Sequence, residues 1–416
     1  MNMKGILVIL DGLGDLPHKL LNGKTPLEAA ETPNMDFFAS RGELGCLFPV
    51  KPGFIPESDE AITSIFGNGL LSSNRGQLEA MGAGIKLDRG DLSLRVNFAT
   101  IDSFEKGNII DRRAGRTLTS EEAEILAEAI NQQIKLSCDF IFEPTIQHRG
   151  VLVFRGGFSE NITGNDETYI QGRSKQFSKI GLCKPLDDEE NSQYTANIVN
   201  EFLEKAYDIL KSHHINLQRK KRGLMPANFL LVRGAGIELP RLKQYKKWVS
   251  INYMPLEIGF SQASGMDVMA FEYPLMESLD AYKNLYDGLE KACNFAIKIL
   301  KKTYKTKNYA YVHLKETDLP GHDNKPIEKK EMIEFIDKNL FDFLRKFAPQ
   351  NKIKILVTGD HSTPCRLKDH SADPVPVLFY NDSLPREKHF SEKDCMLGKL
   401  GRLTDGDLLE KAGFLR

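Results

Sequence analysis

The chain has 416 residues, of which 41% are hydrophobic and 27% are charged, a composition typical of a globular protein. Its formal net charge is -1, so it lacks the overall positive charge that favours a nucleic-acid partner. The six cysteines form no CxxC pairs, which is typical of reduced thiols in the cytoplasm. The apolar run near the N-terminus is too short for a signal peptide or a membrane span. We therefore expect a soluble, cytoplasmic protein with no membrane partner.

The first predicted elements are a strand and a helix. The run GILVIL (5–10) is wholly apolar, which is typical of a strand buried on both faces, and it ends at Asp11. The segment ETPNMDFFASRG predicts a helix with Thr32 as its N-cap, Pro33 at its first position and Gly42 beyond its end.

The middle of the chain has a different pattern. A helix is expected over 119–134, where Thr119 and Glu122 could form a capping box. The other expected elements are strands, over 92–102, 139–144, 149–156 and 227–236. This mixture predicts an α+β domain, which we place at residues 88–252.

The last third of the chain alternates between helices and strands. Expected in order are a helix over 278–305, a strand over 309–315, a helix near 327–347, and strands over 352–359 and 375–380. Such alternation predicts an α/β domain around a mostly parallel sheet. We expect residues 1–87 and 253–416 to form this domain, interrupted by the inserted one.

Three of the expected buried strands are followed by an acid. Asp11 follows the first strand directly, Asp318 comes shortly after the strand over 309–315, and Asp360 follows the strand over 352–359. Ligands of open parallel sheets bind beyond the carboxyl ends of the strands, so three neighbouring strands would bring these carboxylates together. Each acid taken singly is more often a turn residue or a helix cap.

Three histidines accompany the acids. His361 is adjacent to Asp360, His322 lies four residues after Asp318, and His370 precedes the strand over 375–380. Any one of them could be structural, but carboxylate and imidazole together suit Mn²⁺, Zn²⁺ or Mg²⁺. Six such groups suffice for two metal ions about 4 Å apart, an arrangement used for phosphoryl transfer. The sequence therefore predicts a metal site.

Ser58 is the candidate nucleophile. It stands in the acidic segment PESDEAI (56–62), where by itself it could equally be a polar turn residue. A hydroxyl beside two divalent cations needs no histidine base, because the metal lowers its pKa. Other chemistry has little support: the chain has no Walker A loop, no complete GxGxxG and no GxSxG elbow.

Arginines supply candidate anion-binding groups. The segment DRRAGR places Arg112, Arg113 and Arg116 close together, so that two guanidinium groups can face one anion. Arg233 in RGAG, and His148 beside Arg149 in QHRG, are further candidates. A surface salt bridge is the alternative for any one arginine.

The chain resembles the archaeal-type cofactor-independent phosphoglycerate mutases, a branch of the alkaline phosphatase superfamily. The similarity runs nearly from end to end and includes ILDGLGD (9–15), GKTPLEAAETPNMD (23–36), DRRAGR (111–116), HLKETDLPGHDNKP (313–326), TGDHSTPC (358–365) and DHSADPVP (369–376). The resemblance implies an alkaline-phosphatase-like three-layer fold with an inserted domain that closes over the substrate.

The resemblance also implies a role for each candidate residue. One metal ion would be held by Asp11, Ser58, Asp360 and His361, and the other by Asp318, His322 and His370. Mn²⁺ is the preferred ion, with Mg²⁺, Co²⁺ and Zn²⁺ as alternatives, and no 2,3-bisphosphoglycerate would be needed. Substrate phosphate and carboxylate would be contacted by Arg112, Arg113, Arg116, Arg233 and His148.

The implied activity is interconversion of 3-phosphoglycerate and 2-phosphoglycerate through phospho-Ser58, in glycolysis and gluconeogenesis. The chain departs from the family at Ile62, where a histidine is common, at FGNGLLSSNRGQ (66–77), and after Gly401-Arg402, where a histidine is missing. Two alternatives stay open: a metal-dependent phosphatase or phosphotransferase acting on another small phosphate ester, and a catalytically silent protein that binds metal or a partner.

Overall fold

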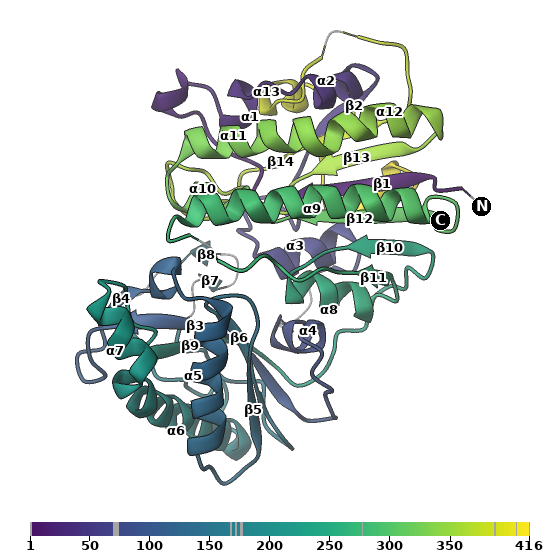
Figure 1. Cartoon of the computed structure of the whole chain (residues 1–416). Coiled ribbons are helices and arrows are strands. Elements are labelled where there is room, and N and C mark those ends of the chain that lie inside the picture. The colour runs from purple at the N-terminus through teal and green to yellow at the C-terminus, as the bar shows by residue number, and fades with distance from the viewer. Residues whose placement is uncertain are drawn as a thin grey trace.

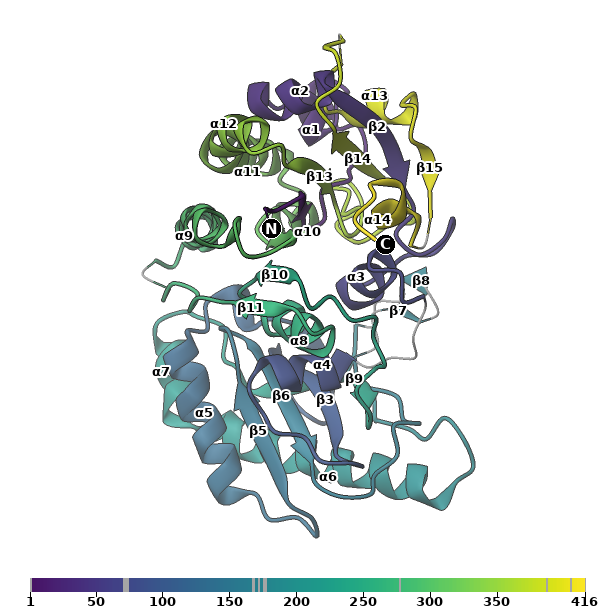
Figure 2. The same ribbon diagram turned by 90° about the vertical axis from the view of Figure 1, so that its right-hand side faces the viewer.

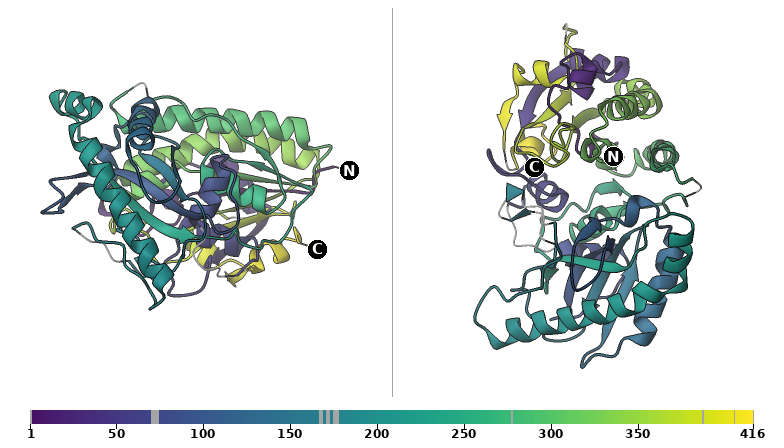
Figure 3. Two further views of the ribbon diagram at one scale, coloured as in Figure 1. Left: turned by 90° about the horizontal axis from the view of Figure 1, so that it is seen from below. Right: turned by 90° about the vertical axis from the view of Figure 1, so that its left-hand side faces the viewer.

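The computed structural model consists of two lobes, one above the other in Figure 1. The residues it describes are 2–69, 75–166, 169–170, 173–174, 178–276, 278–386, 388–404 and 406–415. We call the upper lobe the large lobe and the lower one, formed around residues 92–236, the inserted lobe. Both chain ends lie in the large lobe (Figures 1 and 3).

An eight-stranded sheet forms the centre of the large lobe. All neighbouring strands are parallel except at β14, which is antiparallel to both of its neighbours. In spatial order the strands are β11 (Asp267–Met269), β10 (Trp248–Ile251), β12 (Tyr309–Leu314), β1 (Gly5–Leu10), β13 (Lys354–Thr358), β14 (Val375–Tyr380), β2 (Gly42–Leu47) and β15 (Gly401–Leu403). The expected α/β fold with a mostly parallel sheet is thus confirmed.

Helices cover both faces of this sheet and give three layers (Figure 2). Along β1, alternate side chains enter two different apolar clusters, Ile6 and Val8 on one face and Leu7 and Ile9 on the other. The first face carries α1 (Pro26–Ala29), α2 (Pro33–Ser40), α9 (Ala281–Thr303), α11 (Pro326–Ile336), the π-helical turn η3 (Asp337–Phe341), α12 (Asp342–Gln350) and α13 (Glu392–Met396). The second face carries α3 (Ser58–Ile65), α8 (Pro255–Ala263) and α14 (Asp407–Lys411).

The inserted lobe has an antiparallel sheet of its own, with β9 paired to β3. Its strands are β3 (Leu92–Ile101), β4 (Ile109–Asp111), β5 (Phe140–Pro144), β6 (Arg149–Phe154) and β9 (Phe229–Gly236). One face packs on α5 (Ser120–Gln133) and α6 (Glu190–Ser212), with α7 (His214–Lys221) beside them. The expected capping box of Thr119 and Glu122 starts α5. The remaining short elements are η1 (Lys19–Leu21), η2 (Ala114–Arg116), β7 (Tyr169–Ile170), β8 (Arg173–Ser174) and α10 (Asp318–His322).

The lobes meet at helices α4 (Arg75–Gly82) and α8. A Cβ atom on Gly82 would lie 1.8 Å from the carbonyl oxygen of Pro255, and one on Gly259 would lie 1.8 Å from that of Leu78. Only glycine allows two helix backbones to approach so closely. Ala80 on α4 also packs against Val151 and Val153 of the inserted sheet.

The division into two domains stays a prediction, but one strand lies on the other side of the expected boundary. The expected inserted domain, 88–252, includes residues Trp248–Ile251. They form β10, which pairs with β12 in the large sheet. The chain therefore returns to the large lobe between Gly236 and Trp248.

Three sequence-level details are clarified by the structure. Thr32 stands at the N-cap of α2, but its side chain makes no capping hydrogen bond. The expected helix near 327–347 is α11 and α12 joined through the π-helical turn η3. Within the described residues, no helix is long and apolar enough to cross a bilayer.

Candidate active site

The three predicted acids lie at one edge of the large sheet. β12, β1 and β13 are adjacent and parallel, so their carboxyl ends meet. Asp11 follows β1, Asp360 follows β13 after one glycine, and Asp318 begins α10 just beyond β12. The convergence expected from the strand pattern is therefore present.

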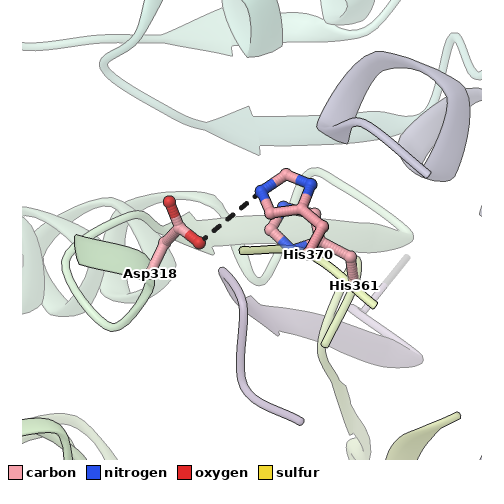
Figure 4. A group of neighbouring side chains, drawn as sticks. All are labelled: Asp318, His361 and His370. Carbon is pink, nitrogen blue, oxygen red and sulfur yellow. Dashed lines mark ion pairs between the residues drawn. The ribbon is translucent and has the colours of Figure 1, made fainter. Parts of the chain in front are cut away.

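The acids and histidines form two groups with metal-binding potential. Ligand atoms of Asp11, Asp360 and His361 lie within 4.8 Å of one another, and so do those of Asp318, His361 and His370. Figure 4 shows the Asp318 carboxylate directed at the His370 ring, which stacks on His361 with 3.7 Å between ring centroids. His322 lies beside the second group, with 3.3 Å between its Nε2 and Asp318 Oδ2. His361 thus stands between the two groups.

The first group has the properties of a cation site. Asp11 Oδ1 and Asp360 Oδ2 are buried, and both face His361 Nε2, at 3.1 and 3.5 Å, with no other donor at hydrogen-bond distance among the described residues. Burial, together with the Asp11 charge, raises the pKa of Asp360 to about 7. Burial lowers the pKa of His361, but the neighbouring carboxylates outweigh it and raise the value to about 9. A divalent ion would supply the positive charge that these crowded carboxylates need, and this oxygen and imidazole set fits such an ion.

Ser58 lies against this group. It is the first residue of α3, and the Glu60 side chain accepts the Glu57 N–H at 2.9 Å to cap that helix. The Ser58 Oγ lies 3.3 Å from His361 Nε2 and accepts a long hydrogen bond, 3.5 Å, from Lys315 Nζ. No histidine lies near Ser58 in the sequence, but His361, which follows β13, lies beside it in the fold.

Lys315 was not predicted from the sequence. It follows β12 directly, and its Nζ contacts Asp11 and, at 2.9 Å, Glu257 Oε1. Burial lowers the pKa of Lys315, but Asp11 and Glu257 outweigh burial and raise it above its usual value. One lysine after a strand carries no recognisable pattern, so only the fold could identify it.

A cavity of about 970 Å³ lies between the lobes over this site. Ten of the twelve predicted residues line it: Asp11, Ser58, Asp318, His322 and His370 from the large lobe, and Arg112, Arg113, Arg116, His148 and Arg233 from the inserted lobe. The other two, Asp360 and His361, are buried beneath it at 0% and 1% exposure. Their roles as ligands and substrate contacts stay predictions.

The inserted lobe gives the cavity a strongly cationic wall. Arg112 pairs with Asp166, Arg116 with Asp323, and Arg233 with Glu57 at 3.3 Å. Burial, with Arg116 nearby, lowers the pKa of Arg113 to about 10. His148 is buried with no hydrogen-bond partner for either ring nitrogen among the described residues, and burial and its arginine neighbours keep its pKa well below the usual range. Such a wall suits an anionic ligand.

A charge network behind Ser58 was also missed. Arg75, the first residue of α4, pairs with Glu57 Oε2 at 2.5 Å, Asp59 at 2.9 Å and Glu79 at 2.8 Å. Glu57 and Asp59 flank Ser58, so this network fixes the serine from both sides. Glu57 and Asp59 lie 18 and 16 residues from Arg75 and belong to another part of the chain, whereas Glu79 has the helical i,i+4 spacing from Arg75.

Ile62, where the family often has histidine, does not face the cavity. It is fully buried and packs with Ile65 and Phe66 in the apolar cluster on one face of the sheet. A histidine at this place in α3 would be buried in the same cluster. A second of the three departures, 66–77, includes residues 70–74, which lie outside the described residues.

Two family models match the chain. The model described as the Metalloenzyme superfamily matches residues 262–411, which contain Asp318, Asp360 and the three predicted histidine ligands. The strand-end ligand groups lie within the region that this model matches, and they suit the metal-dependent class of enzyme that its description names. A second model, described as 2,3-bisphosphoglycerate-independent phosphoglycerate mutase, matches residues 39–216.

Whole-length relatives identify the family. A 2,3-bisphosphoglycerate-independent phosphoglycerate mutase from Pyrococcus abyssi is 40% identical, covering 98% of this chain and 96% of the relative. Its counterpart from Thermococcus kodakarensis is 41% identical, covering 98% and 95%. The solved structure of the PH0037 protein from Pyrococcus horikoshii matches with a TM-score of 0.75 and 32% identity, covering 100% of this chain and 99% of that one. The chain belongs to the 2,3-bisphosphoglycerate-independent phosphoglycerate mutase family.

Proposed function

We propose that this chain interconverts 3-phosphoglycerate and 2-phosphoglycerate by transferring the phosphoryl group to Ser58 and back. The observation that carries the proposal is the position of Ser58: its hydroxyl faces His361 and Lys315 on the floor of a cavity whose other wall is arginine-rich. A phosphorylated three-carbon acid is small enough for this cavity and carries two anionic groups for the opposing wall.

The Ser58 oxygen attacks the substrate phosphorus in line, the bond between phosphorus and the 3-oxygen of glycerate breaks, and the serine proton passes to that oxygen, so that glycerate is left in the cavity. Lys315, at 3.5 Å, offers positive charge to the serine oxygen and to the phosphoryl oxygens as the new bond forms. Bound divalent ions would lower the pKa of the Ser58 hydroxyl and neutralise charge on the transferring group. Asp11, Ser58, Asp360 and His361 would hold one ion, and Asp318, His322 and His370 the other. Mn²⁺ is the ion we propose.

The arginine-rich wall orients the substrate. Arg113 and Arg149 line the cavity and form no ion pair with any described residue, so their guanidinium groups are available to the substrate carboxylate and phosphate. Arg112, Arg233 and His148 lie beside them. While Ser58 carries the phosphoryl group, glycerate turns within the closed cavity, and its other hydroxyl takes the group back.

This chemistry needs no 2,3-bisphosphoglycerate, because Ser58 itself stores the phosphoryl group. We propose that the reaction serves glycolysis and gluconeogenesis in the cytoplasm. The inserted lobe acts as the cover of the site, since water that reached phospho-Ser58 would hydrolyse it.

An enolase-coupled assay with Mn²⁺ tests the proposal. Wild-type protein should convert 3-phosphoglycerate without added 2,3-bisphosphoglycerate, and phosphate release should be much slower than isomerisation. The Ser58→Ala variant should lose about 10⁴-fold or more in kcat, because the nucleophile is removed. Ser64→Ala, in the same helix, is the control and should stay active. Retained isomerisation in Ser58→Ala contradicts the nucleophile assignment.

A further inference from the structure

Arg116 joins the two lobes at the rim of the cavity. Its guanidinium group, from the inserted lobe, donates to both carboxylate oxygens of Asp323 in the large lobe. Asp323 caps the C-terminus of α10 and follows His322 directly. Arg116 and His322 both line the cavity, so the ion pair borders the opening between the lobes. The family resemblance assigned Arg116 to the substrate, whereas the structure gives it a protein partner.

Asp323 is itself held in place by Tyr282, which lies in the first turn of α9. The Tyr282 hydroxyl donates to Asp323 Oδ2 at 2.9 Å. The Lys325 ammonium lies over the Tyr282 ring, 3.9 Å from its centroid. The Asp323 carboxylate therefore has a fixed orientation toward the inserted lobe.

The loop that presents Arg116 is rigid. Ala114, Gly115 and Arg116 have φ values of 47°, 67° and 55°, so two non-glycine residues adopt the strained left-handed conformation. Asp111 Oδ1 accepts the N–H groups of Arg113 and Gly115 at 2.7 and 2.8 Å.

The same loop is fastened from beneath by Arg219. This side chain is fully buried and donates to the carbonyl oxygens of Thr117 and Ala114 at 3.0 and 3.3 Å. A strained loop with this many supports keeps one shape. Its Arg116 can therefore act as a fixed contact point of the inserted lobe.

We propose that Asp323, braced by Tyr282, is a positioning residue that holds Arg116 and so keeps the inserted lobe closed against water during the reaction. This inference rests on the proposed function. In this inference, the Arg116–Asp323 pair sets how often the enzyme isomerises its substrate rather than releasing phosphate.

The competing reaction that this contact suppresses is hydrolysis of the intermediate. A water oxygen attacks the phosphorus of phospho-Ser58, the bond between phosphorus and Oγ breaks, Oγ takes a proton from that water, and inorganic phosphate leaves. Glycerate is then released without its phosphoryl group. The ratio of phosphate released to 2-phosphoglycerate formed measures how well the cavity is closed.

Three conservative variants test the inference at a Mn²⁺ concentration that saturates the wild type and at saturating 3-phosphoglycerate. Asp323→Asn removes the charge, and the phosphate-to-product ratio should rise about tenfold or more, corresponding to about 1.4 kcal/mol of lost discrimination. Tyr282→Phe removes one hydroxyl and should raise the ratio about two- to fivefold. Asp323→Glu keeps the charge and should restore much of the wild-type ratio. Tyr286→Phe, one turn further along α9, is the matched control and should leave the ratio unchanged.

Two results would overturn the inference. One is an unchanged ratio in Asp323→Asn with slower overall turnover, which would leave Arg116 as a substrate contact only. The other is a raised ratio that returns to the wild-type value when more Mn²⁺ is added. That result would show that the substitution acts by weakening metal binding through the neighbouring His322.

A second readout does not depend on the reaction. Amide hydrogen exchange in residues 111–117 and 318–323 of the unliganded protein should be faster in Asp323→Asn than in wild type and Tyr286→Phe. Unchanged exchange would contradict the contact itself. If wild-type protein fails to isomerise 3-phosphoglycerate but Asp323→Asn still exchanges faster than wild type, the proposed function is refuted and the contact between the lobes is supported.

Discussion

Lys329 and Asp15 form a fully buried ion pair, with 2.8 Å between Nζ and Oδ2, beneath the loops that carry the metal-binding groups. Lys329 also donates to the carbonyl oxygens of Gly14 and Thr363. Thr363 in turn donates to Asp318 Oδ1 at 2.7 Å. The loops after β1 and β13 are therefore tied to α11 by one ammonium group.

Lys329→Met should destabilise the protein by about 3–5 kcal/mol, because it leaves the Asp15 carboxylate buried without its partner. Urea unfolding measures the change. Lys330→Met is the control: Lys330 is next in the chain and pairs with Glu334 near the surface, so its loss should cost less than about 1 kcal/mol. Equal losses in the two variants would contradict a special role for the buried pair.

Lys315→Met should lower kcat about 10²- to 10³-fold, because a cation next to the Ser58 oxygen is lost where charge develops. Steady-state kinetics on 3-phosphoglycerate provide the measurement. Lys346→Met, which removes an exposed pair with Asp342, is the control and should retain normal kcat. A rise in KM with kcat unchanged would show that Lys315 binds the substrate and the transition state equally and does not favour the transition state.

Metal removal should destabilise the chain, because the Asp11 and Asp360 carboxylates share one buried site and repel each other. Adding Mn²⁺ after chelation should raise Tm by several degrees. Asp360→Asn removes one of the two charges, so the metal-free variant should be more stable than metal-free wild type by roughly 1–2 kcal/mol. The same variant should lose most of the rise in Tm that Mn²⁺ causes. A full response in Asp360→Asn would remove Asp360 from the ligand set.

Glu392 should give part of the stability a pH dependence outside the active site. Burial raises its pKa to about 7, although Thr25 donates a hydrogen bond of 2.6 Å to its Oε2. Between the unfolded value near 4.5 and about 7, the folded state binds more protons than the unfolded state. The contribution of Glu392 is therefore fully present below about pH 4.5 and is lost as the pH rises through 7.

Glu392→Gln should accordingly gain stability relative to wild type as the pH rises from 5 to 8, by on the order of 2 kcal/mol. Urea unfolding at both pH values provides the comparison. Glu28→Gln, at a nearby carboxylate in the capping box of α1, is the control and should not gain. A constant difference between Glu392→Gln and wild type across this range would contradict the raised pKa.

Much of the large lobe could be predicted because its strands are short apolar runs and its key acids follow them. β1, β12 and β13 each read as buried strands, and their adjacency brings the acids together. β10 was missed because four residues, WVSI, are too few to show a period.

Contacts between distant segments could not be predicted. Glu57 contacts Arg75 on α4 and Arg233 on β9, so each pair joins two different elements and no period within one element predicts it. Arg116 illustrates the same limit, since its partner Asp323 lies 207 residues away. Ile62 misleads in the opposite direction. An isoleucine where the family often has a histidine suggested that a catalytic group is missing, whereas the buried position of Ile62 shows a packing role.

The contact of Gly82 with Pro255 and of Gly259 with Leu78 brings the segments before and after the inserted lobe together. The inserted lobe therefore departs from the large lobe and rejoins it at nearly one point, as an insertion within a surface loop does. The length and outer surface of the inserted lobe can therefore differ among relatives without displacing the strands that carry the predicted metal ligands. Evolution can thus remodel the cover and leave the catalytic floor unchanged.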